Sequence, residues 1–271
     1  KPPGAEQGSV QDVFVASTRK LVGGSAVLSG TRSPAMHYFD FSVAVPPDHI
    51  PGTVRFPRRR PPNLQTDFVT ISATQFRDRS AFVNSLNSVA RQKQPQDREV
   101  VLFVHGFNTN FAEGLYRQAQ LSHDFGSRGI SVNFSWASAG DLRAYAYDRE
   151  SALLARDGLE SLLLSVSASN AARIVIIAHS MGAQVVMETL RQMEIRGAPV
   201  FFDKLSSVVL VAPDIGVDLF VSQATPLAEL DIPLYIFVSS RDRALRLSSL
   251  LRGRAPRLGM LTDAAALGDL P

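Results

Sequence analysis

Residues 174–183 read IVIIAHSMGA and carry the strongest fold signal in the chain. Four consecutive β-branched residues predict a buried strand, and Ser180 followed by Gly182 predicts a tight turn into a helix. Such a turn holds a serine in a strained conformation with its hydroxyl exposed above the sheet. Ala178 stands where glycine is usual, and a side chain this small should still fit. We therefore predict that Ser180 is a nucleophile, with His179 and Gly182 supporting it; the alternative is an ordinary serine–glycine turn.

Apolar strands alternate with amphipathic helices from Glu99 onward. The predicted strands are residues 100–104, 130–136, 173–178, 207–212 and 233–239, and the predicted helices are 111–127, 141–167, 181–194, 219–230 and 244–251. Residues 1–98 instead show short β runs at 13–16, 39–45 and 68–76 between proline-rich loops, and then a helix at 80–91. The pattern predicts one doubly wound α/β domain over residues 1–271, with a β-rich part at 1–98 and a mostly parallel sheet covered by helices on both faces.

The long predicted helix 141–167 has apolar positions that should face the core. These positions are Leu153, Leu154, Leu162, Leu163 and Val166.

Composition excludes several classes of protein. The 271 residues are 45% hydrophobic and contain no cysteine, which excludes a thiol nucleophile, a zinc–thiolate site and an iron–sulfur cluster. The net charge of +3 comes from interspersed charges, and the one dense basic run, residues 58–60, lies between prolines without aromatic neighbours, so nucleic-acid binding is not expected. No apolar run reaches the roughly 18 residues of a membrane span. We also expect no cofactor and no metal, because neither a phosphate-binding loop nor metal ligands at usable spacing occur.

A second chemical signal is the stretch VLFVHGFN at residues 101–108. In hydrolases with this strand-to-helix arrangement, the loop after such a strand gives one backbone N–H to an oxyanion hole, and the residue after the nucleophile gives the other. We predict Phe107 and Met181 as these donors. His105 could be proposed as a general base, but a histidine in this position more often braces the loop, together with Gly106 and Asn108.

These motifs together resemble an α/β-hydrolase, and most closely the bacterial DUF900 family of uncharacterised α/β-hydrolases. The residues that carry the resemblance are 15–19, 43–46, Gly52, Pro57, 105–109, 135–136, 147–148, 178–182, 212–214, 239–245 and 257–259. The resemblance covers nearly the whole chain and implies an esterase-like or lipase-like enzyme. The residues outside the two hydrolase motifs say little about the substrate.

Two aspartates qualify as the acid of a catalytic triad, which should lie on a loop at the carboxyl edge of the sheet. Asp242 follows the predicted strand 233–239, where the superfamily usually places its acid, and Asp214 follows the preceding strand. We favour Asp242 and keep Asp214 as the alternative.

The base is missing from the expected order. All five histidines precede Ser180, whereas the superfamily order is serine, acid and then histidine. The resemblance implies a further strand and a histidine-bearing loop beyond Gly268, so we expect the 271 residues to end before them and to show little hydrolase activity. His37, His49 and His123 are expected to play ordinary structural parts.

Aromatic residues lie at the end of the predicted strand 130–136 and just after it. Trp136, Tyr145 and Tyr147 could wall a pocket for an acyl or alcohol group. The alternative is that the two tyrosines only pack a helix onto the sheet.

The favoured function is hydrolysis of carboxylic esters, on a small-molecule or lipid-like substrate, through an acyl-enzyme intermediate. Alternatives are a thioesterase, amidase or acyltransferase with the same site, or a non-catalytic envelope-associated binding domain on a hydrolase scaffold. The opening at Lys1 with a Pro/Gly-rich segment slightly favours export, to the periplasm or the envelope, over the cytoplasm. The oligomeric state stays open.

Overall fold

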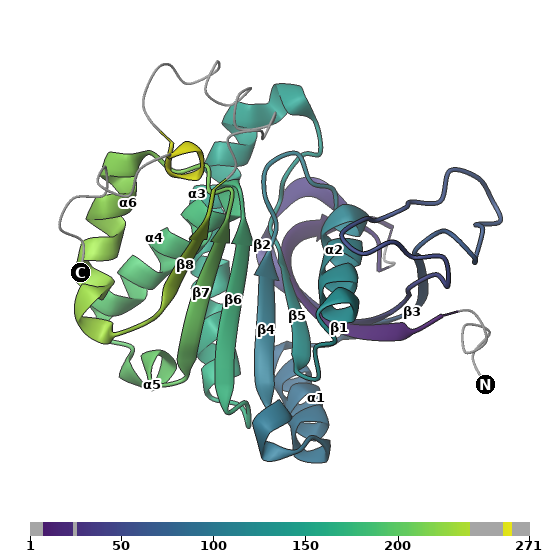
Figure 1. Cartoon of the computed structure of the whole chain (residues 1–271), viewed down its shortest axis with the longest axis horizontal. Helices are drawn as coiled ribbons and strands as arrows, with labels where there is room; N and C mark the ends of the chain where they lie inside the picture. Colours follow the sequence, from purple (N-terminus) through teal and green to yellow (C-terminus); the bar gives the residue numbers. More distant parts are fainter. Residues whose placement is uncertain (1–7, 24–25, 239–256, 262–271) are drawn as a thin grey trace.

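The computed structural model describes residues 8–23, 26–238 and 257–261. One eight-stranded sheet has the order β3-β2-β1-β5-β4-β6-β7-β8 (Figure 1). Its strands are β1 (Val10–Leu21), β2 (Leu28–Ala44), β3 (Val69–Phe76), β4 (Glu99–Val104), β5 (Ile130–Ser135), β6 (Arg173–His179), β7 (Leu205–Val211) and β8 (Leu234–Phe237). Strands β1 and β4 to β8 run parallel to one another. Strand β2 pairs antiparallel with β1, and β3 pairs antiparallel with β2. The prediction of a mostly parallel α/β sheet is confirmed.

Helices connect most of the parallel strands. They are α1 (Arg79–Gln92), α2 (Phe111–Asp124), α3 (Tyr145–Ser167), α4 (Met181–Arg196), α5 (Pro199–Phe202) and α6 (Val217–Ala224), and short 3-10 turns lie at Pro95–Asp97, Leu142–Ala144, Thr225–Leu230 and Leu258–Met260. Three predicted helices were too long: 3-10 turns replace the start of 141–167 and the end of 219–230, and the helix predicted at 111–127 ends at Asp124. The predicted helix 244–251 lies outside the described residues.

Side-chain caps mark where α1 and α2 begin. Asp78 accepts a hydrogen bond from the Ala81 N–H at the start of α1. At α2, Asn110 accepts from the Glu113 N–H while the Glu113 carboxylate accepts from the Asn110 N–H, which forms a capping box. Helix α4 ends at Gly197, whose positive φ of 75° suits glycine.

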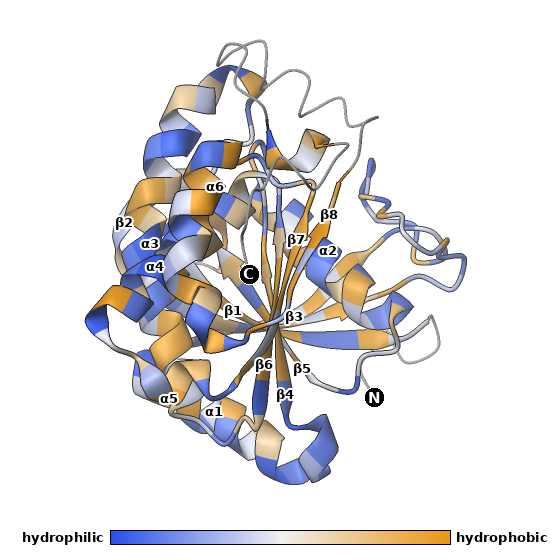
Figure 2. Ribbon diagram, turned by 60° about the vertical axis from the view of Figure 1, so that its left-hand side comes forward, coloured by the Kyte–Doolittle hydropathy of each residue, from blue (hydrophilic) through white to orange (hydrophobic). Residues whose placement is uncertain are grey.

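The β-rich first third belongs to the same sheet as the rest. Strand β1 pairs with β5 in parallel and with β2 antiparallel, so it joins the two halves. Its side chains alternate between two cores because successive strand residues point to opposite faces. Phe14 and Ala16 enter the larger core with α1, α3 and α4, and Val13 and Val15 enter the smaller core with α2. Figure 2 shows α1, α3 and α4 on one side of the sheet and α2 on the other.

Strands β6 to β8 are less completely covered on the face where α2 lies. Ile177 and Val211 on this face are only partly buried, and Tyr235 and Phe237 are 53% and 59% exposed. Helices α4 and α6 lie on the opposite face with the larger core.

None of the helices in the described part of the chain is both long and apolar enough to cross a membrane.

Helix α3 shows where the apolar pattern identified the core and where it failed. Leu162, Leu163 and Val166 are buried as predicted, but the predictions for Leu153 and Leu154 were wrong, because these side chains are 51% and 62% exposed. An apolar residue at helical spacing is not necessarily on the buried face.

We expect Leu159→Ala in α3 to lower the free energy of unfolding by about 2–5 kcal/mol, because Leu159 is fully buried and its truncation leaves a cavity. The matched control is Leu154→Ala on the same helix, which should cost well under half as much because that side chain is already 62% exposed. Urea unfolding at neutral pH measures both. Equal losses would contradict the placement of α3.

Candidate functional site

Ser180 occupies a strained turn between β6 and α4. Its φ of 51° and ψ of −119° lie outside the regions that a residue with a side chain normally adopts. The turn is held by backbone hydrogen bonds, since the Ser180 N–H donates to Val211 O at 3.0 Å and Ser180 O accepts from Ala183 and Asp214, each at 3.1 Å. The strained turn is therefore held by β7, the loop after β7 and α4.

Two glycines allow the Ser180 turn to lie directly against the loop after β4. A Cβ added to Gly106 would lie 2.8 Å from the Ser180 Cβ, and one added to Gly182 would lie 2.4 Å from His105 O. Both distances are too short for real side chains. The two predicted motifs thus meet in space through backbone contacts that only glycine permits.

A buried arginine holds the loop after β4 in place. Arg19, near the end of β1, is 1% exposed, and its guanidinium donates to Thr109 O at 2.7 Å and to Ser138 O at 2.8 Å. Its Nε donates to Ser135 Oγ at 2.8 Å. Burial lowers the pKa of Arg19 to about 10, with Asp148 and Glu113 acting in the opposite direction, so the group stays charged at neutral pH. A single cation therefore ties β1, the loop after β4 and the loop after β5 together.

His105 braces the same loop. Its Nδ1 lies 2.9 Å from Gly106 O, and its Nε2 lies 3.1 Å from Trp136 O and 3.3 Å from an Arg19 nitrogen. The Trp136 ring stacks on the imidazole, and its Nε1 donates to His105 O at 2.7 Å. Burial, and next the Arg19 charge, lower the pKa of His105 to about 3 despite the two carbonyl contacts. The imidazole is neutral and both ring nitrogens are engaged, which is the arrangement of a brace.

Asp148 at the start of α3 anchors the adjoining turns. It is fully buried, and its carboxylate accepts from Ser138 Oγ at 2.5 Å, from Ala139 N at 2.8 Å and from Asn108 N at 3.3 Å. Asn108 has a φ of 54°, a conformation that asparagine tolerates better than most residues. The backbone that follows Phe107 is thus fixed by a buried carboxylate.

The role of Phe107 and Met181 as oxyanion donors stays a prediction. Met181 is the first residue of α4, and a helix leaves its first N–H groups without an acceptor in the helix. The ring of Phe107 packs edge-on against Tyr145, with 5.0 Å between the ring centres. Both residues flank the contact between Gly106 and Ser180.

Asp214 lies close to the Ser180 turn and is 1% exposed. Its carboxylate accepts from Tyr145 Oη at 3.1 Å and lies 3.6 Å from Arg257 Nε. Asp242, the favoured acid, lies outside the described residues. The choice between the two aspartates stays a prediction.

Three other histidines have partners elsewhere in the fold. His37 on β2 bonds Ser33, His49 bonds Asp124, and His123 bonds Ser9. His179, the last residue of β6, lies in the wall of a cavity.

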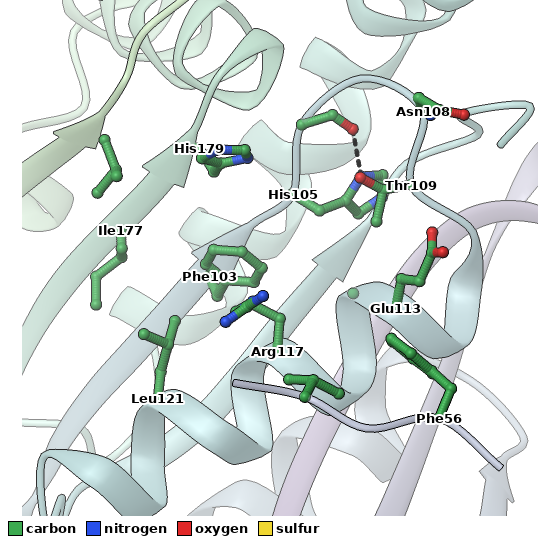
Figure 3. A pocket seen from close by; sticks show the side chains of 14 residues that line it. Phe56, Phe103, His105, Asn108, Thr109, Glu113, Arg117, Leu121, Ile177 and His179 are labelled. Carbon is green, nitrogen blue, oxygen red and sulfur yellow. Dashed lines mark hydrogen bonds between the residues drawn. The ribbon is translucent and has the colours of Figure 1, made fainter. Parts of the chain in front are cut away.

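The cavity of about 550 Å³ lies beside the site on the α2 side of the sheet (Figure 3). His105 and His179 lie at one end of it, and Phe103 and Ile177 form part of its apolar wall. Ser180 is not among the residues that line it. We therefore do not assign a substrate group to this cavity.

The three aromatic residues considered for a pocket do not line that cavity. Trp136 is fully buried against His105, and Tyr145 bonds Asp214. The hydroxyl of Tyr147 lies 3.2 Å from Gly30 O, which packs the start of α3 against the strand β2. A pocket role for these residues stays a prediction.

The sequence did not identify the structural roles of Arg19 and Asp148. Both residues lie in segments that carry the family resemblance, but no function was predicted for either side chain. A charged residue near the end of an apolar strand was a usable signal for Arg19, but its partners at residues 105, 109 and 138 are far away along the chain.

Comparison with known protein families identifies one match. A family model described as an alpha/beta hydrolase of unknown function (DUF900) matches residues 81–266. The curated proteins contain no match to the chain.

We expect the His105 imidazole to show no titration between pH 8 and pH 5 in NMR spectra, because its pKa lies near 3. The unfolded chain binds a proton on this group below about pH 6.5, whereas the folded protein does so only near pH 3. The stabilising effect of the neutral form is thus complete above pH 6.5 and is lost as the pH falls toward 3, by up to about 1.4 kcal/mol per pH unit. The variant His105→Gln should lack this part of the pH dependence in urea unfolding. A ring titration near pH 6.5 in the folded protein would contradict the assignment.

Proposed function

We propose that the chain, which belongs to the DUF900 family of α/β-hydrolases, is a serine hydrolase that cleaves carboxylic esters through an acyl-enzyme at Ser180. The observation that carries the proposal is the backbone of Ser180, with φ of 51° and ψ of −119° at the junction of β6 and α4. A strained serine at such a junction is the nucleophile elbow of this superfamily. Contacts from Gly106 and Gly182 hold it beside the loop that would complete the site.

In the proposed reaction, Ser180 Oγ attacks the ester carbonyl carbon and a base takes the hydroxyl proton. The negative charge that develops on the carbonyl oxygen is stabilised by the N–H groups of Phe107 and Met181. Collapse of this intermediate breaks the bond to the alcohol, which leaves with the proton, and water then hydrolyses the acyl-serine by the same steps. The bonds from Arg19 and Asp148 support this role because they keep the donor loop from moving as the charge develops.

We propose a histidine as the base, since imidazole accepts a proton near neutral pH. His105 does not suit this role because both its ring nitrogens are engaged, and His37, His49 and His123 bond other groups. We propose Asp242 as the acid that orients the base. The Asp214 carboxylate accepts a hydrogen bond from Tyr145 and lies beside Arg257, which supports a structural role for Asp214.

A fluorophosphonate probe tests the nucleophile directly. We expect one covalent adduct per chain, located on Ser180 by peptide mass spectrometry, and none in Ser180→Ala. The matched control is Ser222→Ala, which changes an exposed serine on α6 and should be labelled as the original chain is. Circular dichroism checks that Ser180→Ala stays folded. The labelling is done on the complete protein, and a folded complete protein that is unlabelled at Ser180 would contradict the proposal and favour the non-catalytic alternative.

A pair of substitutions tests the acid. In the complete protein, we expect Asp242→Asn to reduce p-nitrophenyl ester hydrolysis far more than Asp214→Asn, since loss of the group that fixes the base's tautomer can cost about 10⁴ in rate. Thermal melts show whether Asp214→Asn, which alters a buried contact, acts through stability instead. The reverse order of rates, with both variants folded, would move the acid to Asp214.

A further inference from the structure

Two histidines and an aspartate come together far from Ser180. His49 lies in the loop after β2, and His123 and Asp124 form the last turn of α2. One ligand atom from each of the three side chains lies within 4.8 Å of the others. Helix α2 begins just after the donor loop and is 14 residues long, about 20 Å, so this cluster lies at the opposite end of the helix from the proposed site.

The three side chains are already oriented by other groups. Ser9 Oγ lies 2.7 Å from His123 Nδ1, which leaves Nε2 as the ring nitrogen for another partner. Asp124 Oδ2 accepts from the Gly52 N–H at 2.6 Å and from Gln120 Nε2 at 2.5 Å. Its other oxygen, Oδ1, lies 2.6 Å from His49 Nε2. Outer contacts of this kind, to imidazole and carboxylate, are those that orient ligands around a bound metal.

The cluster is largely shielded from solvent and combines one carboxylate with two imidazole rings. The side chains of His49 and Asp124 are 4% and 10% exposed. The Asp124 carboxylate lies beside two imidazole rings whose centres are 5.3 Å apart.

We propose that His49, His123 and Asp124 form a zinc-binding site. Two imidazoles and one carboxylate are a usual ligand set for this ion, and water would complete its tetrahedron. Zinc between His49 Nε2 and Asp124 Oδ1 would separate these atoms from 2.6 Å to about 3.3 Å, a small movement of two side chains. The bound ion would fasten the loop after β2 to the end of α2.

The three ligands of the proposed zinc site are not all close together in the sequence. The sequence has no metal ligands at short, regular spacing, and it therefore predicted no metal site. His49 and Asp124 are 75 residues apart, and only the packing of the loop after β2 against α2 brings them together.

The experiment uses the tag-free chain after treatment with a chelator and dialysis. We expect calorimetric titration with ZnCl₂ to show one zinc ion per chain, with the count confirmed by elemental analysis, and the melting temperature to rise when zinc is added. His123→Gln and Asp124→Asn each remove a ligand and should weaken zinc binding about 100-fold or more. Ser9→Ala keeps all three ligands, so a loss of about 10-fold is expected.

The matched control is His37→Gln, which removes a histidine bonded to Ser33 on β2 and should leave zinc affinity unchanged. Circular dichroism of the metal-free proteins shows whether each variant is folded, and Ser9→Ala keeps the test valid if a ligand variant unfolds. Absence of saturable zinc binding to the original chain would overturn the proposal. Binding that is equally tight in folded His123→Gln, Asp124→Asn and Ser9→Ala would overturn it as well. Neither result bears on Ser180, whose labelling is measured separately.

Discussion

The geometry of the site depends on the hydrogen bonds that the buried guanidinium of Arg19 donates. The guanidinium donates to Thr109 O, Ser138 O and Ser135 Oγ, so it joins three loops or strands that are distant along the chain. Removing one partner of a buried, charge-assisted hydrogen bond leaves the other groups without compensation and costs several kcal/mol. Such a cation is tolerable inside the protein because carbonyl oxygens surround it and the carboxylates of Asp148 and Glu113 stabilise its charge.

The strain at Ser180 is possible because its surroundings are rigid. A residue with a side chain at φ of 51° is disfavoured by roughly 1–3 kcal/mol, and such a conformation persists only where neighbouring structure enforces it. Here the enforcing groups are the strand β7, which accepts from the Ser180 N–H, and the loop of Gly106, which lies against the Ser180 Cβ. The rigidity that Arg19, His105 and Trp136 give to that loop is therefore also what keeps the serine in place.

Helix α2 runs from the loop after β4 to the loop after β2. Its first turn is capped by Asn110 and Glu113, directly after the loop that Arg19 and Asp148 hold. Its last turn carries His123 and Asp124, which contact the segments at Ser9 and at residues 49–52. One rigid helix thus connects the proposed catalytic loop with the proposed metal site, and it covers the smaller core in between.

The sequence by itself determined the local features: the parallel strands from β4 to β8, the helix that begins after Ser180, and the two glycine-containing turns. These follow from periodicity and from residue types whose preferences act over a few residues. The lengths of β1 and β2, the exposure of Leu153 and Leu154, the bracing by Arg19 and Asp148, and the meeting of His49 with Asp124 were decided only by the tertiary structure. Each of these depends on groups that lie far apart along the chain, and a local sequence pattern contains no information about which distant group will compensate a buried charge or cover an apolar face.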